Sequence, residues 1–262
     1  MSDFVEELVF DFYQERQLKE TKNLILSKRI ASLKSTDKFR FINENWEYLP
    51  YEGFAILSMV KNNPDNTGLL KQLSSIREKL SQALPIQKCF LLPEQSYHQT
   101  VANLLSAERF YKHLKEKNKI VEFPTLIKNI FEEAIQHKNK QVIKMRMIGL
   151  SVFSSAIGIL GIFESKDDYN QIVSFRKSIY ENTALNSLDI KRTRPFIGHI
   201  TLAYLDGKIS DIQQEKLLNT CNQINHQLKE TPVYFNIKQT ELRSYNHLAQ
   251  FNFHKDFPTY QF

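Results

Sequence analysis

The stretch HQTVANL at residues 98–104 has a counterpart in HITLAYL at residues 199–205, and both follow the pattern H-x-T-φ-A-x-L, in which φ is aliphatic. Successive side chains of a β-strand point to opposite faces, so the His and the Thr of each stretch are expected on one face. If the two strands lie side by side, two imidazoles and two hydroxyls point into one space. The repeat therefore predicts a single site to which both halves of the chain contribute.

These residue types suit the cleavage of a phosphodiester or a cyclic phosphate. The reaction needs a base for the attacking hydroxyl or water, an acid for the leaving oxygen, and donors for the nonbridging oxygens. The ordinary histidine pKa near 6.5 lets one ring act neutral and another protonated at about pH 7, and threonine hydroxyls donate to phosphate oxygens. No third metal ligand lies at a useful spacing from His98 and His199, so we expect no metal and no other cofactor.

A single histidine in an apolar strand is usually a core residue that hydrogen bonds satisfy. Two copies that share His, Thr, Ala and Leu at equal spacing favour a functional pair instead. The remaining histidines lack this context and are expected at surface or packing positions; they are His113, His137, His226, His247 and His254. Of these, His247 and His254 lie near the last strands and are candidates for the rim of the site.

The composition is that of an ordinary globular protein. The chain has 262 residues, 42% of them apolar and 24% charged, which suits one large domain or two small lobes. The net charge of +6 favours anionic partners such as nucleotides, RNA or phosphorylated metabolites. The only two cysteines, Cys89 and Cys221, have no metal-binding spacing, which favours a reducing, cytoplasmic location.

Neither a signal peptide nor a membrane span is expected. The first residues, MSDFVEE, lack the basic-then-apolar form of a signal peptide. The uncharged run from Met147 to Phe163 is shorter than the roughly 20 residues that a spanning helix prefers. Its glycines and its Ser154-Ser155 pair fit two strands joined by a turn better.

The order of apolar patterns predicts an α+β fold with two similar halves, because strands alternate with helices twice over. Residues 1–50 are expected to form a helical extension, with helix over 3–48, and residues 51–262 the two-lobed body. The expected strands are 53–60, 88–92, the two motif strands, 141–153, 156–163, 233–238, 240–245 and 248–254. The expected helices of the body are 69–84, 106–137 with a break at Pro124, 167–182 and 210–230.

At the two motifs the chain resembles the two-histidine (2H) phosphoesterases, the superfamily that includes the LigT-like RNA 2′,3′-cyclic phosphodiesterases. Its members carry two H-x-[T/S]-φ motifs roughly a hundred residues apart, as here over about residues 51–254. The resemblance implies a bilobal α+β fold in which each lobe gives one motif strand to a central cleft. It also implies that His98 and His199 are the acid and the base, and that Thr100 and Thr201 bind the phosphate oxygens. The extension over residues 1–50 is absent from the smallest members.

Further substrate contacts are predicted around the second motif. Arg194 precedes it in a short basic cluster, and Arg146 interrupts an apolar strand; each is a candidate for phosphate binding or a solvated charge. Phe196 and Tyr204 are candidates for stacking a base or for the core. Tyr97 and Gln99 are expected to face away from the cleft as packing residues.

We therefore expect a metal-independent phosphodiesterase, a hydrolase that cleaves a 2′,3′-cyclic phosphate or a 2′-5′-type linkage in RNA, oligonucleotides or nucleotides. Two alternatives remain open. The first is a nucleotide- or RNA-binding protein that uses the cleft without turnover. The second is an adaptor that binds a protein partner through residues 1–50.

Overall fold

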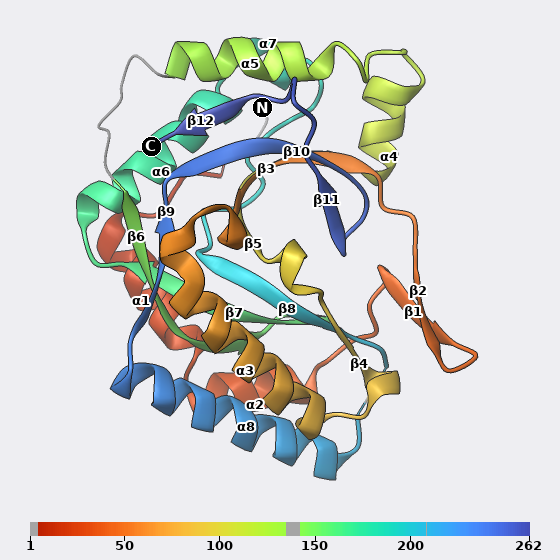
Figure 1. The fold of residues 1–262 in the computed structure, drawn as a ribbon, viewed down its shortest axis with the longest axis vertical. Coiled ribbons are helices and arrows are strands. Elements are labelled where there is room, and N and C mark those ends of the chain that lie inside the picture. Colours follow the sequence, from red (N-terminus) through yellow and green to blue (C-terminus); the bar gives the residue numbers. More distant parts are fainter. Residues whose placement is uncertain (1–4, 135–141, 208) are drawn as a thin grey trace.

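Two antiparallel sheets form the body of the protein in a computed structural model that describes residues 5–134, 142–207 and 209–262 (Figure 1). The first sheet has the order β11-β10-β3-β5, with β12 also paired to β10, and the second has the order β4-β8-β7-β6-β9. The strands are β1 (Phe39–Ile42), β2 (Asn45–Tyr48), β3 (Gly53–Met59), β4 (Cys89–Leu91), β5 (His98–Ser106), β6 (Ile143–Val152), β7 (Ala156–Phe163), β8 (His199–Leu205), β9 (Val233–Ile237), β10 (Gln239–His247), β11 (Gln250–Asn252) and β12 (Thr259–Gln261).

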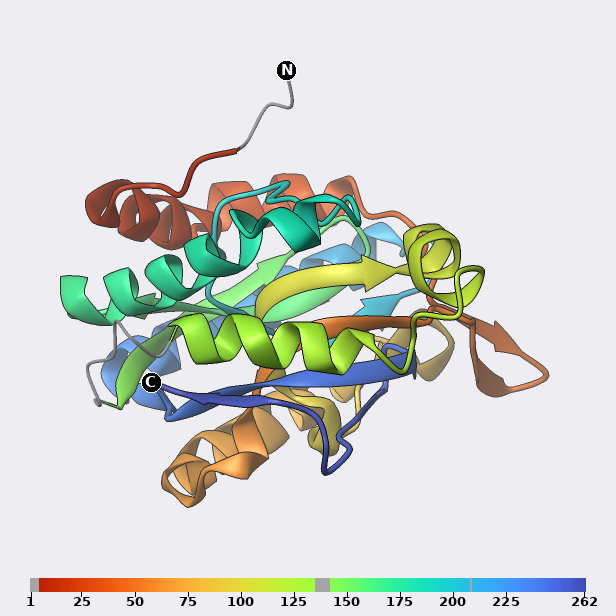
Figure 2. The ribbon, with the colours of Figure 1, turned by 90° about the horizontal axis from the view of Figure 1, so that it is seen from above.

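Helices flank both sheets (Figure 2). They are α1 (Phe10–Glu20), α2 (Asn23–Ala31), α3 (Thr67–Ala83), α4 (Ala107–Phe110), α5 (Phe123–Ala134), α6 (Lys166–Tyr180), α7 (Thr183–Asn186) and α8 (Asp211–Glu230). Short 3-10 segments η1 to η4 lie at Val60–Asn62, Pro64–Asn66, Ile86–Lys88 and Glu94–Ser96, and a π-helical turn η5 at Tyr111–Lys115. Helices α1, α2 and α8 contact the second sheet, whereas α6 reaches β5 of the first sheet as well as β6 and β7 of the second.

The expected α+β architecture is confirmed, but the two lobes exchange strands. The first sheet combines β3 and β5 with the C-terminal strands β10, β11 and β12, and the second takes β4 from the first half of the chain. Each lobe is therefore completed by the other half of the sequence. This exchange ties the two motif-bearing strands, β5 and β8, into one body (Figure 1).

Most elements of the body lie where the apolar patterns predict them. The apolar stripe of α3, which is Leu69, Leu73, Ile76 and Leu80, is buried, and Ser210 caps α8 through a capping box with Gln213. The uncharged run 147–163 forms the β6–β7 hairpin, as expected. Among the described residues, no helix combines the length and the apolar character that a bilayer crossing requires.

The predicted helix over 106–137 is divided. The chain forms α4, the π-helical turn η5 and then α5, in whose first turn Pro124 stands, a position that tolerates proline. Residues 135–137 of that prediction, with His137, and residue 141 of the predicted strand 141–153 lie outside the described part of the chain. The short elements α7 and β12 were not expected from the sequence.

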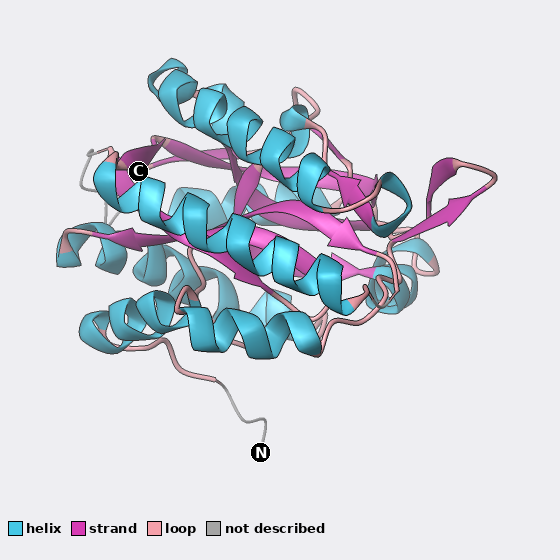
Figure 3. Cartoon of the chain, turned by 90° about the horizontal axis from the view of Figure 1, so that it is seen from below, coloured by secondary structure: helices cyan, strands magenta, loops and turns pink. Residues whose placement is uncertain are grey.

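The N-terminal prediction is right for α1 and α2 but wrong for residues 39–48, which form the β1–β2 hairpin instead of a helix. Asn43 and Glu44 adopt positive φ angles of 48° and 63°, as a tight two-residue hairpin turn requires. The aromatic residues of the two strands pair across the hairpin, with Phe41 5.4 Å from Trp46 between ring centroids. The turn end of the hairpin projects from the body in Figure 3. The division of the chain at residue 50 stays a prediction.

Candidate active site

The two motif strands belong to different sheets and carry the same irregularity. In β5 the pairing with β3 skips Val101, and in β8 the pairing with β7 skips Leu202. Both residues occupy the φ position of the motif, directly after the threonine. A β-bulge inserts one extra residue and re-aims the side chains that follow. The two copies of the motif therefore share a backbone geometry as well as a sequence.

The bulge changes which motif positions face the site. Along each strand the first five positions follow one burial pattern, with His and Thr half-buried and the other three buried. Because the bulge adds one residue, the sixth position of the motif returns to the face that bears His and Thr. That position is Asn103 in β5 and Tyr204 in β8. A regular strand without a bulge would turn both residues to the opposite face.

Each motif histidine is held by the carbonyl two residues before it. His98 Nδ1–H donates to Ser96 O (2.6 Å), and His199 Nδ1–H donates to Ile197 O (3.0 Å). A carbonyl can only accept, so Nδ1 carries the proton and the neutral ring presents Nε2 as an acceptor. No described residue bonds either Nε2 atom. Each ring can therefore accept a proton at its Nε2 atom.

A phenylalanine stands edge-on to each imidazole. The ring centroid of His98 lies 4.4 Å from that of Phe251, and the centroid of His199 lies 5.5 Å from that of Phe153, each with an interplanar angle of 65°. Gly158 makes room for Phe153, because a Cβ there would lie 2.9 Å from the phenylalanine ring. These contacts fix the imidazoles and exclude water from one side of each.

Burial lowers the pKa of both histidines to about 4. The carbonyl partners oppose this shift, because they favour the protonated ring. Neighbouring positive charge adds to the lowering: His199 and Arg243 act on the pKa of His98, and Arg194 acts on that of His199. Without a bound anion, both rings are therefore neutral at pH 7.

Gln99 links the two motif strands directly. Its Nε2 donates to Ile197 O (3.1 Å), and its Oε1 accepts from the backbone N–H of His199 (2.6 Å). The residue is fully buried. Sequence alternation correctly turns Gln99 away from the cleft, but packing is only part of its role. The sequence did contain a signal for this link: Gln99 is a polar residue at a strand position expected to be buried, and a buried amide requires hydrogen-bond partners. Tyr97, also expected to pack, is buried.

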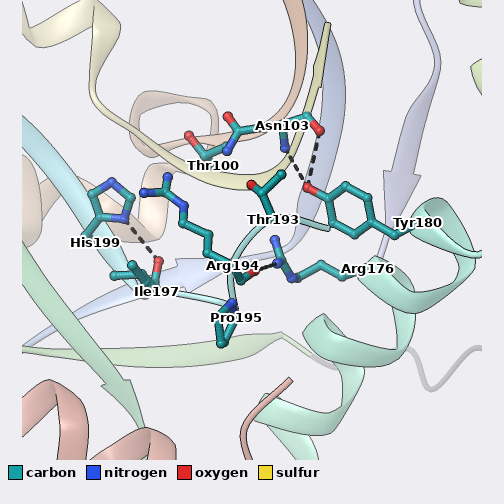
Figure 4. Close-up of a pocket in the computed structure, with 9 residues that line it drawn as sticks. All are labelled: Thr100, Asn103, Arg176, Tyr180, Thr193, Arg194, Pro195, Ile197 and His199. Carbon is teal, nitrogen blue, oxygen red and sulfur yellow. Dashed lines mark hydrogen bonds between the residues drawn. The ribbon is translucent and has the colours of Figure 1, made fainter. Parts of the chain in front are cut away.

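A small pocket opens beside His199 (Figure 4). It is lined by Thr100, Asn103, Arg176, Tyr180, Thr193, Arg194, Pro195, Ile197 and His199. The guanidinium of Arg194 lies between Thr100 and His199 (Figure 4). The pocket therefore brings together the threonine of the first motif, the histidine of the second and a predicted phosphate ligand. Thr201 and His98 do not line it, although Thr201 shares the half-buried face of β8 with His199.

The backbone of Asn103 is bound by Tyr180. The Tyr180 hydroxyl accepts from Asn103 N (3.0 Å) and donates to Asn103 O (3.2 Å). Tyr180 and Arg176 both come from α6 and were not predicted as site residues. Their spacing of four residues places them on one helix face, but nothing local in the sequence indicates that this face meets β5. Long-range packing alone reveals it.

Two of the accessory candidates, Arg146 and Phe196, lie outside the pocket beside His199, as their alternative interpretations of a solvated charge and a core residue expect. Arg146 lies on the same face of the second sheet as His199, but β7 separates their strands, and its Nε donates to Glu164 (2.6 Å). Its charge is matched by this carboxylate, and it does not line the pocket. Phe196 is 1% exposed and packs against Tyr13 of α1 (6.0 Å between centroids), so it cannot stack a base.

Tyr204 faces the other end of the site, where its ring lies 5.0 Å from that of Phe39 in β1. The ring is half-buried, and base stacking by Tyr204 stays a prediction. His247, expected at a rim, stacks on Tyr48 of the β1–β2 hairpin at 4.4 Å. The hairpin therefore lies against the second sheet through Tyr204 and against the end of β10 through His247.

Among the described residues, no group of three or more His, Cys, Asp or Glu side chains is arranged to hold a metal ion.

Comparison with known proteins points to one family. The family model 2H-phosphodiest, described as a domain of unknown function (DUF1868), matches residues 40–151, which contain the first motif but not the second. Uncharacterized protein 127L of Invertebrate iridescent virus 6 is 26% identical over 186 residues, which cover 65% of this chain and 73% of that protein.

One solved structure shares the fold. The conserved protein of unknown function ATU0111 from Agrobacterium tumefaciens str. C58 has a TM-score of 0.54 at 14% identity, over 79% of this chain and 85% of that one. TT0787 of Thermus thermophilus is a more distant likeness, with a TM-score of 0.44 at 13% identity over 72% of this chain and 86% of that one. The 2H-phosphodiest family model covers the first motif strand, and the second motif strand repeats its sequence, bulge and histidine geometry. These findings support an assignment of the chain to the 2H phosphoesterase superfamily, to which it is similar over residues 40–151.

Proposed function

We propose that the protein is a metal-independent phosphodiesterase that cleaves 2′,3′-cyclic phosphates or 2′-5′-type linkages in RNA, oligonucleotides or nucleotides. The observation that carries the proposal is the equivalence of the two histidines. Each lies on a bulged motif strand, and each donates from Nδ1 to a carbonyl and keeps Nε2 available. Two such groups can serve as the base and the acid of one displacement at phosphorus.

For a 2′,3′-cyclic phosphate the reaction is a hydrolysis. One neutral histidine removes a proton from water as the water oxygen forms a bond to phosphorus. The bond from phosphorus to one ribose oxygen breaks, and the other histidine, in its protonated form, gives its proton to that oxygen. The products are a phosphomonoester and a free ribose hydroxyl. The similar settings of His98 and His199 allow either to act as the base.

The proposed phosphate ligands are Thr100, Thr201 and Arg194. Each threonine lies two residues after its histidine on the half-buried face of its strand. The Arg194 guanidinium is exposed and lies beside Thr100 and His199 (Figure 4). Arginine presents a fork of donors that matches two phosphate oxygens. These groups would hold the nonbridging oxygens while negative charge builds up on them.

The proposed acid, a protonated histidine, forms only when the anionic substrate is bound. Both histidines have a pKa of about 4 in the free protein, so neither is appreciably protonated at pH 7. A phosphodiester next to the rings favours the protonated form and raises the pKa. We therefore expect the pH optimum of kcat to lie above that of kcat/KM, because kcat reports the bound complex and kcat/KM the free protein.

The test is turnover of 2′,3′-cyclic nucleotides and 2′-5′ oligonucleotides by the purified protein with EDTA present. His98→Ala and His199→Ala are each expected to lower kcat by about 10²–10⁴-fold. His226→Ala, at an exposed position of α8, is the matched control and should retain activity. Wild-type protein that binds these ligands tightly and forms no product would instead be a nucleotide- or RNA-binding protein.

Two wider expectations accompany this proposal. Both cysteines, Cys89 and Cys221, are free and buried, which fits a reducing, cytoplasmic location. A protein partner for residues 1–50 stays a prediction. Phe12 and Leu24 of α1 and α2 are more than half exposed, at 63% and 66%, and would be part of such a surface.

A further inference from the structure

The segment that leads into the second motif has no regular structure of its own. Residues 191–198 form neither helix nor strand, yet they carry Arg194 into the pocket and end at the base of β8. An irregular segment needs side-chain partners for its backbone groups. The N-terminal residues 5–17 supply many of them, although they are distant in sequence.

Glu7 is the centre of these contacts. Its Oε2 accepts from the backbone N–H of Phe196 (2.6 Å), and its Oε1 accepts from Arg176 Nε (2.7 Å). Arg192 Nη1 lies 3.7 Å from the same Oε1. The side chain of Glu7 is 11% exposed, and those of Arg176 and Arg192 are 6% and 8% exposed. One carboxylate therefore compensates two buried guanidinium groups and one backbone donor.

Arg176 carries the connection to the first motif. One of its terminal nitrogens, Nη1, donates to the carbonyl of Val101, the bulged residue of β5, and the other, Nη2, donates to Arg194 O (3.3 Å). The second of these bonds is drawn in Figure 4. The guanidinium is planar and rigid, so its donors hold their partners in a fixed relation. One side chain thus binds the backbone of both motif segments.

Helix α1 makes further hydrogen bonds to the segment over residues 191–198. Arg16 donates to Phe196 O, and Gln17 Nε2 donates to Gly198 O (2.7 Å) and to Gly161 O (3.0 Å). Val5 O also accepts from Arg192 Nε. The lead-in segment is therefore held at residues 192, 196 and 198 by the N-terminal segment, up to the residue before His199.

We propose that Glu7 and Arg176 are positioning residues that set the second motif against the first, so that residues 5–17 complete the active site. Glu7 orients the guanidinium of Arg176 and fixes the Phe196 amide, and Arg176 then holds the Val101 and Arg194 carbonyls together. As a statement about catalysis this rests on the proposed phosphodiesterase function; as a statement about geometry it does not.

The experiment compares Glu7→Gln with Glu6→Gln in the full chain. Glu6 is exposed, so the control makes the same charge change one residue away. Glu7→Gln keeps an acceptor for the Phe196 amide but removes the charge that orients Arg176. We expect kcat for a 2′,3′-cyclic nucleotide to fall about 10- to 100-fold with KM changed less than about threefold. Glu7→Asp, which keeps the charge, should recover part of the loss, and Glu6→Gln should match the wild type.

A second readout does not depend on activity. Hydrogen exchange of the Phe196 amide is expected to be slow in the wild type and at least about tenfold faster in Glu7→Gln, because the bond to the carboxylate is weakened. A Phe196 amide that exchanges in the wild type as fast as an unstructured amide overturns the proposal, whatever the variants do. So does a Glu7→Gln protein with a lowered melting temperature but unchanged kcat.

The two readouts separate the proposals. If the wild type turns over none of the substrates, the phosphodiesterase function fails, while the amide exchange still decides whether Glu7 holds the lead-in segment. If the wild type is active and Glu7→Gln differs from Glu6→Gln in neither kcat nor exchange, the positioning role fails alone.

Discussion

At the scale of single residues, the proposed function depends on two histidines that are neutral in the free protein and take up a proton when an anion binds. Burial provides the low pKa of about 4, and the carbonyls of Ser96 and Ile197 fix the tautomer. The sequence predicted His98 and His199 as a pair from the repeated motif. It could not predict their tautomers, because the carbonyl partners depend on how the chain enters each strand.

The lowered pKa values make the stability of the protein depend on pH. Between about pH 4 and 6.5 the unfolded chain binds more protons at His98 and His199 than the folded chain, so stability falls as the pH is lowered through this window. A shift of this size corresponds to at most about 3.5 kcal/mol for each histidine. His98→Gln should flatten this pH dependence, relative to the wild type, when the free energy of unfolding is measured by urea titration at pH 4.5 to 7. If the free energy of unfolding of His98→Gln depended on pH as steeply as that of the wild type, the lowered pKa of His98 would be contradicted.

Gln99 provides a test of the link between the motifs. Gln99→Met keeps the length of the side chain but leaves Ile197 O and the His199 amide without this partner. We expect a loss of about 1–3 kcal/mol in the free energy of unfolding and a fall in kcat. Gln223→Met, at an exposed position of α8, is the control for both measurements. A Gln99→Met protein as stable and active as this control would show that the link is dispensable.

At the scale of elements, the sequence predicted helices and strands correctly where the apolar pattern extends over many residues. Helices α3 and α8 and the β6–β7 hairpin follow from apolar spacing and capping. The bulges at Val101 and Leu202 gave no local signal, since they arise from pairing with β3 and β7. The error over residues 39–48 came from charge density, which masked the alternating aromatic residues of β1 and β2.

Gly198 tests the contact between α1 and the start of β8. A Cβ at this position would lie 2.5 Å from the Tyr13 hydroxyl, 2.7 Å from Gly161 O and 2.7 Å from Met145 Sδ. Gly198→Ala should therefore displace α1 and lower the free energy of unfolding by about 1–3 kcal/mol.

The matched control is Gly68→Ala in α3, where a Cβ meets nothing within 4 Å. Alanine in a helix should leave stability unchanged or raise it by up to about 1 kcal/mol. Urea denaturation of both variants checks the pair of predictions. Equal stabilities would mean that α1 does not pack on Gly198 as described.

At the scale of the whole molecule, the exchange of strands between lobes and the contacts of residues 5–17 with residues 191–198 have one effect. Both hold β5 and β8, which belong to different sheets, at a fixed separation. The order of strands and helices predicted two similar halves, the repeat predicted that both motifs face one space, and the family resemblance implied a central cleft. The sequence could not predict that Glu7 reaches Arg176 or that Arg146 pairs with Glu164, because such ion pairs join residues with no shared local pattern.

In the proposed mechanism both motif histidines reach one phosphorus-bearing group. A crystal structure of the protein with a bound nucleoside 2′- or 3′-phosphate tests it most directly. We expect one phosphate with its oxygens within about 3.2 Å of both Nε2 atoms and of the Thr100 and Thr201 hydroxyls. A phosphate that contacts only one of the two histidines, or that binds outside the space between β5 and β8, would contradict it.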